Sequence, residues 1–167
     1  MTPTPDALFR ALFSVISEKH RSCEQRLAAL PASAITERRL INTERGMYSL
    51  VLRAGFVFPD ERDTEKAIFC HKKRLPEILP ADNPQRLVYD ALSEEDKSRC
   101  ATYLYCMTVL QTRFIDSYRG VLENARICGD TDAAFHAELK IRVLSSCMAL
   151  LRDVWASFGA ALPQFDI

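Results

Sequence analysis

Hydrophobic side chains recur every three or four residues along most of the chain, which is the spacing of a helix with one buried face. In the first 30 residues the steps alternate between four and three. This 3.5-residue rhythm is typical of a helix that packs along a neighbouring helix. The stripe consists of Phe9, Phe13, Ile16, His20, Cys23, Leu27 and Leu30. Thr4 and Pro5 supply a cap and a first turn, and we expect Pro31 to end this helix.

A second helix is predicted over residues 36–54, with Gly55 placed to adopt the left-handed conformation that often follows a helix. One side of this helix is apolar, and a polar row on another side contains Arg38, Asn42, Arg45 and Ser49. The segment 47–58 is rich in Val, Tyr and Phe, which favour strands. A strand pair therefore remains an alternative to helix there.

A third helix is predicted over residues 63–74. Proline follows at positions 76, 80 and 84, and proline lacks the amide hydrogen that a helix interior requires. We expect Pro76 to stop the helix and residues 76–84 to form a proline-interrupted connector. A short helical turn is expected over residues 85–92.

The clearest helix start is Ser93, because a serine cap is followed by Glu94, Glu95 and Asp96 in the first turn, where the helix dipole favours acids. From there one long helix is predicted to reach Cys128 and to end at Gly129. Its middle, ATYLYCMTVL, is apolar nearly all round. This composition indicates a central helix that neighbours cover on several sides.

A last helix is predicted to start at Asp130 or Thr131 and to end at Gly159. Its apolar positions repeat the 3.5-residue rhythm at Ala137, Ile141, Leu144, Met148, Leu151, Trp155 and Phe158. The sequence therefore predicts an all-α fold: a single-domain bundle spanning residues 1–167, with about five helices, two or three of them long.

The charge balance argues against a nucleic-acid partner. The 167 residues contain 22 basic and 22 acidic side chains, whereas nucleic-acid binders usually carry a positive excess. No stretch of 18 apolar residues occurs, so no membrane span is expected. The first 20 residues do not have the pattern of a signal peptide, and we therefore expect a cytoplasmic protein whose six cysteines are reduced thiols.

Few residues have the spacing of a chemical site. His20 and Cys23 share a helix face and could hold half of a zinc site, but both also fit the buried stripe, where a cysteine acts as a small hydrophobe. Motifs for binding phosphate or dinucleotides and for nucleophilic catalysis are absent from the sequence. We therefore predict no catalytic residues, no metal and no cofactor.

Two surfaces are predicted to contact a partner. Lys72, Lys73 and Arg74 form a run of cations at the end of the third predicted helix, and we name these three residues the cationic edge. The C-terminal tail keeps three large apolar side chains, which either fold back on the bundle or insert into a partner. They are Leu162, Phe165 and Ile167.

These patterns favour a non-catalytic helical adaptor or regulator that binds another protein. A second copy of the chain is a candidate partner, because a regular 3.5-residue stripe can close a dimer as readily as a core. The alternative is a helical bundle, with or without enzymatic activity, that binds a metal or a small ligand near His20 and Cys23.

Overall fold

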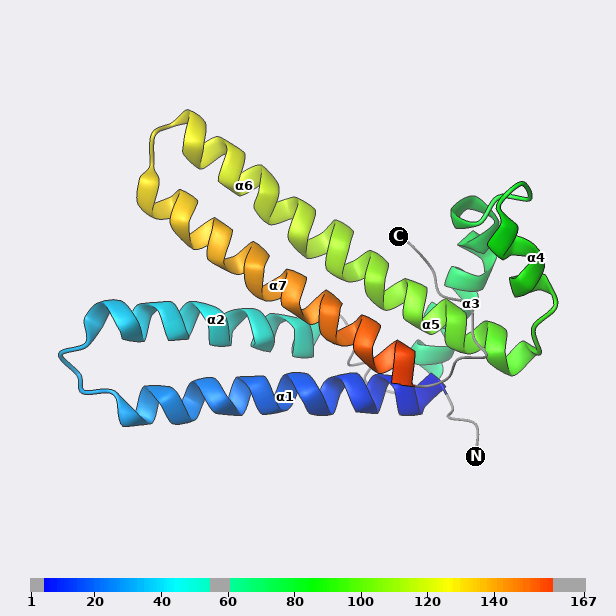
Figure 1. Cartoon of the computed structure of the whole chain (residues 1–167), viewed down its shortest axis with the longest axis horizontal. Coiled ribbons are helices and arrows are strands. Elements are labelled where there is room, and N and C mark those ends of the chain that lie inside the picture. Colours follow the sequence, from blue (N-terminus) through cyan, green and yellow to red (C-terminus); the bar gives the residue numbers. More distant parts are fainter. Residues whose placement is uncertain (1–4, 55–60, 158–167) are drawn as a thin grey trace.

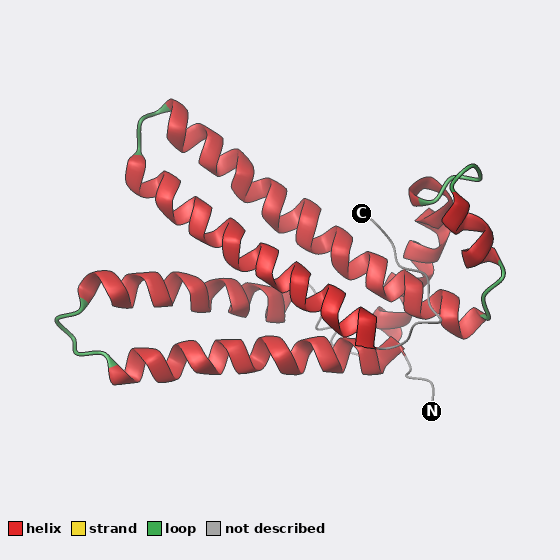
Figure 2. Ribbon diagram, in the orientation of Figure 1, coloured by secondary structure: helices red, strands yellow, loops and turns green. Residues whose placement is uncertain are grey.

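The computed structural model describes residues 5–54 and 61–157, and all regular structure within these ranges is helical (Figure 2). The predicted all-α bundle is confirmed. Residues 47–54 are helical, so the strand alternative is wrong for this part, while 55–58 lie outside the described residues together with the predicted end residues Gly55, Phe158 and Gly159. Within the described ranges, no helix has the length and apolar character needed to cross a membrane.

The helices form two long hairpins and a shorter pair that packs at one end (Figure 1). In chain order they are α1 (Pro5–Ala29), α2 (Ile35–Ala54), α3 (Glu61–Ile78), α4 (Pro84–Asp90), α5 (Glu94–Thr108), the π-helix η1 (Val109–Ile115), α6 (Asp116–Ile127) and α7 (Thr131–Ser157). The α1–α2 hairpin and the α6–α7 hairpin lie together near α5 and diverge toward their tips (Figure 1).

Helices α5, η1 and α6 form one continuous rod, as predicted, but its middle is a π-helix rather than an α-helix. The wider π turn changes which side chains face α7. Four of the seven η1 residues are buried, namely Val109, Leu110, Phe114 and Ile115. The π segment thus contributes an apolar face to the core.

Local sequence signals start α5 and α7 and end α6 as predicted. Ser93 Oγ accepts a hydrogen bond from the Asp96 amide at 3.2 Å, so Ser93 caps α5. Asp130 Oδ1 accepts from the Ala133 amide at 3.0 Å and caps α7. Between them Gly129 has a φ of +70°. This left-handed residue reverses the chain in a Schellman motif, in which the Asp130 amide donates to the Ala125 carbonyl.

The prediction that Pro76 stops the third helix is wrong, because α3 continues to Ile78. Pro76 itself is exposed, whereas its neighbours Leu75 and Leu79 are buried on the inner face. The Leu79 amide donates to the Leu75 carbonyl at 2.7 Å, so the helical pattern resumes directly after the proline. Burial of two leucines offsets the single hydrogen bond that Pro76 removes. The connector is accordingly 79–83 and not 76–84.

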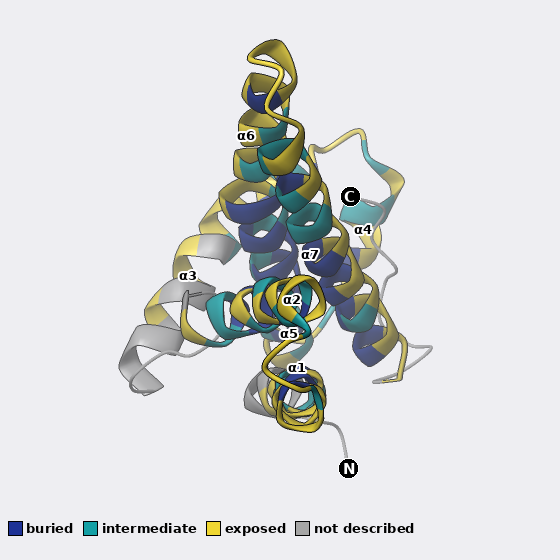
Figure 3. Ribbon diagram, turned by 90° about the vertical axis from the view of Figure 1, so that its left-hand side faces the viewer, coloured by how far each residue is buried: buried dark blue, intermediate teal, exposed yellow. Residues whose placement is uncertain are grey.

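The hydrophobic core centres on α5, η1 and α7, which together supply most of its buried residues (Figure 3). Tyr103 and Trp155 stack there with ring centroids 4.5 Å apart and an interplanar angle of 19°. The apolar middle of the rod is buried on nearly every side, as its composition predicted. The stripe of α1 is only partly buried. Ile16, Cys23 and Leu27 enter the core, but Phe13 is 42% exposed, contrary to expectation.

Candidate functional site

A groove opens between α2 and α7 where the two hairpins diverge. It is a shallow hollow of about 660 Å³ that is wide open to solvent, and much of its exposed surface is apolar although five of its nine lining residues are polar or charged. Residues of the loop before α2, of α2 and of α7 line it: Ala32, Ile35, Arg38, Arg39, Asn42, Thr43, Gly46, Met47 and Lys140. We name these residues the α2–α7 groove. A second hollow of about 270 Å³, lined in part by Ser49 and Leu50, continues along α2 from Gly46 to Arg53.

An ion pair joins the two sides of the groove near its outer end. Arg39 on α2 donates through both terminal nitrogens to Asp132 on α7, at 2.9 and 3.3 Å. Beside it, Thr43 Oγ1 lies 3.4 Å from Nδ1 of His136, and His136 Nε2 lies 3.7 Å from Asp132 Oδ1. These contacts place polar groups of both helices along one edge of the groove.

Arg38 lines the groove and also binds the C-terminal end of α1. Its Nη1 donates to the carbonyls of Leu27 and Leu30 at 3.0 and 3.1 Å. These carbonyls lie at the C-terminal end of α1, where few intrahelical donors are left and a cation is also favoured by the helix dipole. Arg38 thereby links the start of α2 to the end of α1.

The groove combines an apolar floor with cations at its rim. Met47 is buried at its base, while Ile35 is 74% exposed. Three cations border it, namely Arg38, Arg39 and Lys140. Lys140 Nζ lies 5.0 Å from the centre of the Tyr118 ring on α6. Asp132 pairs with Arg39, and none of the described residues that line the groove is a carboxylate. The rim therefore carries an excess of positive charge although the chain as a whole is neutral.

The four residues of the polar row predicted on α2 lie in different surroundings in the structure. Arg38 and Asn42 line the α2–α7 groove, and Ser49 lines the adjoining hollow. Arg45 lies near enough to Cys23 on α1 to lower the pKa of that thiol, an effect outweighed by burial and by Glu44. The spacing of polar residues on α2 therefore indicated Arg38 and Asn42, which form one edge of the groove. It could not indicate Lys140 on the other wall, because Lys140 is about 100 residues away along the chain.

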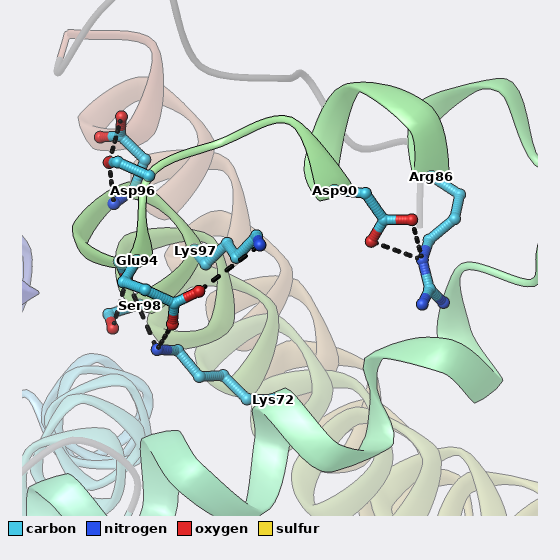
Figure 4. Close-up of polar contacts among 8 residues, drawn as sticks. Lys72, Arg86, Asp90, Glu94, Asp96, Lys97 and Ser98 are labelled. Carbon is cyan, nitrogen blue, oxygen red and sulfur yellow. Dashed lines mark hydrogen bonds and ion pairs between the residues drawn. The ribbon is translucent and has the colours of Figure 1, made fainter.

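The cationic edge lies on α3 and is partly engaged within the molecule (Figure 4). Lys72 Nζ lies 3.4 Å from Oε2 of Glu94 and 3.5 Å from its carbonyl oxygen. This hydrogen bond and charge lower the pKa of Glu94. Lys73 Nζ lies 4.6 Å above the exposed Phe69 ring, and Arg74 is exposed. The other predicted contact residues, Leu162, Phe165 and Ile167, lie outside the described residues.

A buried arginine near the start of α5 was not foreseen. Arg99 is only 2% exposed and pairs with Glu95 at 2.6 Å and with Asp96. Its Nε is buried without a hydrogen-bond partner in the part of the chain that the structure describes. The acids of the first turn therefore neutralise a buried charge in addition to complementing the helix dipole. Glu95 and Asp96 precede Arg99 by four and three residues. This spacing, typical of ion pairs on a helix, was the sequence signal for the pairing.

His20 and Cys23, the two residues considered for a metal site, lie in different surroundings. His20 Nδ1 lies 3.9 Å from Glu24, while Cys23 is buried in the core, where burial and the Glu44 carboxylate raise the pKa of its thiol. Within the described residues, no group of three or more His, Cys, Asp or Glu side chains is arranged to hold a metal ion.

The buried thiols are poor nucleophiles. Burial raises the pKa of Cys100 and of Cys147 to about 12, and it raises the pKa of Cys106 as well. A thiol attacks as the thiolate, so these three groups are inert near neutral pH. Their place in the core accounts for them as packing residues.

Comparison of the chain with protein family models, with curated proteins and with solved structures finds no significant match. The function proposed below therefore depends on the side chains and geometry just described.

Proposed function

We propose that this protein is a non-catalytic helical adaptor that acts by binding another protein, and that the α2–α7 groove is its docking surface. The observation that supports the proposal most is the groove itself, an open and mostly apolar hollow between two helices. Such grooves accept the apolar face of a partner element, and burying apolar surface drives most protein association.

The exposed side chain of Ile35 supports the same conclusion. At 74% exposure it contributes nothing substantial to the core, and its position at the start of α2 places it on the groove. A large aliphatic side chain left in water is unremarkable when single. Beside an apolar hollow it adds to a continuous surface that a partner would remove from water.

Affinity capture with purified full-length protein tests this proposal. The immobilised chain is exposed to an extract of the cells that produce it, alongside the variants Ile35→Asp and Ile127→Asp. Ile127 is a matched control, because it is 76% exposed but lies at the end of α6, away from the groove.

We expect wild type and Ile127→Asp to retain the same protein, which Ile35→Asp releases. The retained protein, once purified, must bind the chain with a defined stoichiometry in a calorimetric titration. A second copy of the chain qualifies if Ile35→Asp abolishes the dimer. The proposal is contradicted if the chain stays monomeric and retains nothing, or if Ile35→Asp retains its partner as well as wild type does.

A further inference from the structure

The charge and shape of the α2–α7 groove indicate the chemistry of its occupant. We infer that the groove binds an acidic amphipathic helix of a partner protein, with the apolar stripe of that helix on the floor and its carboxylates against the cations of the rim. This inference rests on the proposed function, and it adds the class of partner.

Charge complementarity is the first argument. Arg38, Arg39 and Lys140 line the groove, no carboxylate is among its described lining residues, and Asp132 pairs with Arg39. Complementary charge guides a partner to its site and disfavours partners of the wrong sign. Arg39 is paired with Asp132, but the rim as a whole keeps a net positive charge, which favours an acidic helix over a basic one.

The dimensions of the groove favour a helix over an extended peptide. The α2 wall runs from Ile35 to Arg53 when the adjoining hollow is included. At 1.5 Å per residue this wall is about 27 Å long, which matches a partner helix of about 18 residues. The walls are helices whose backbone hydrogen bonds are internal, so no free sheet edge is available there to pair with an extended strand.

Gly46 provides a sensitive position for a test. It lies on the floor where the two hollows meet, and a Cβ built there contacts nothing within 4 Å. A Cβ at position 46 is therefore accommodated by the fold, at a position that lines both hollows. Gly120 on α6 is equally open and lies outside the groove, so it supplies a matched control.

The experiment uses a library of helix-forming peptides of about 18 residues with a leucine stripe at positions i, i+3, i+4 and i+7. The remaining positions vary among Glu, Gln and Lys. Peptides are selected on the immobilised full-length chain and counter-selected on the support without protein. We expect glutamate to be enriched next to the leucine stripe.

Selected peptides are then measured by fluorescence anisotropy on four purified chains. We expect Gly46→Glu to weaken binding by about tenfold or more, while Gly46→Lys and Gly120→Glu change it by less than about twofold. Because Glu and Lys are of similar bulk, the difference between the two Gly46 variants isolates charge. Circular dichroism confirms that each variant is folded.

Enrichment of lysine or glutamine, or equal loss of binding in Gly46→Glu and Gly46→Lys, overturns the inference of an acidic partner. So does the absence of any selected peptide when the capture experiment above recovers a partner or a groove-mediated dimer. In those cases the adaptor proposal stands. If the capture experiment and the peptide selection both fail, the adaptor proposal and the inference of an acidic partner are both overturned.

Discussion

Arg39 on α2 and Asp132 on α7, which are 93 positions apart in the sequence, form a bidentate ion pair with Nη2–Oδ2 and Nη1–Oδ1 distances of 2.9 and 3.3 Å. The pair joins the two hairpins next to the α2–α7 groove, yet both side chains are more than half exposed. Exposed pairs gain little from Coulomb attraction in water, so the apolar contacts of the core must hold the hairpins together.

A double-mutant cycle with Arg39→Ala and Asp132→Ala tests this interpretation. We expect a coupling free energy of about 0.2–1 kcal/mol for folding, measured by urea denaturation, because the pair is solvated. Raising the salt concentration should reduce it further. A coupling well above 2 kcal/mol would show that the hairpins depend on this ion pair.

Thiol reactivity provides a second check on the fold. Cys70 and Cys128 are exposed, whereas the other four cysteines are buried. With a chromogenic disulfide reagent at pH 8, we expect two of the six thiols to react rapidly and four to react only as the protein unfolds. Cys128→Ser should remove one rapid thiol. Rapid reaction of more than two thiols would contradict the packing of the core.

Alkaline pH should destabilise the protein through its buried thiols. The folded-state pKa of Cys100 and Cys147 is about 12, compared with an ordinary value of 9.0. Between these values the unfolded chain loses the proton and the folded chain retains it, so the free energy of unfolding falls as pH rises. Well below pH 9 the two groups contribute almost no pH dependence.

Each of these thiols accounts for a decrease of at most about 1.4 kcal/mol per pH unit. Tyr48 and Tyr89 add to the effect above pH 10, because burial raises their pKa to about 12. Urea denaturation of wild type and Cys147→Ala at pH 7 to 11 measures the slope. The variant should have a shallower decline, and an identical slope would argue against a buried thiol at position 147.

Three glycines should respond differently to alanine. Gly46 and Gly120 lie within helices where a Cβ meets nothing, so Gly46→Ala and Gly120→Ala should each stabilise the protein by about 0.5–1 kcal/mol. Gly129 has a φ of +70°, and Gly129→Ala should destabilise it by about 1–2 kcal/mol. Thermal unfolding gives the sign in each case. Stabilisation by Gly129→Ala would contradict the left-handed turn between α6 and α7.

The cationic edge remains a prediction for partner binding. Because Lys72 contacts Glu94, reversing all three charges would also disturb the junction of α3 with α5. The double variant Lys73→Glu/Arg74→Glu leaves that contact intact and is the better test. If the edge docks an acidic surface, this variant should weaken binding to the captured partner by about tenfold. Unchanged affinity would remove the cationic edge from the interface.

Local signals predicted the helix boundaries well where one residue decides them. Ser93 and Asp130 cap their helices through their own side chains, and Gly129 ends α6 because it can adopt a positive φ. Pro76 misled the prediction because its effect depends on tertiary contacts. The burial of Leu75 and Leu79 outweighs the lost hydrogen bond. This burial depends on how α3 packs against other helices, which the local sequence does not indicate.

The candidate site was less predictable than the helices. One edge of the groove, Arg38 and Asn42, appeared as a polar row on α2. The opposite wall depends on how two hairpins cross, which sets Lys140 beside residues about 100 positions earlier. The π segment at Val109–Ile115 also lacked a signal, because its apolar composition fits a buried α-helix equally well.

Photo-cross-linking tests the central claim most directly. Benzoylphenylalanine is placed at Ile35 in the α2–α7 groove or, as a control of matched exposure, at Ile127. Each purified full-length protein is irradiated with the captured partner and the products are identified by mass spectrometry. We expect a covalent adduct with the partner from position 35 and none from position 127. An adduct formed only from position 127, or from neither position while the partner is bound, would contradict the groove as the docking surface.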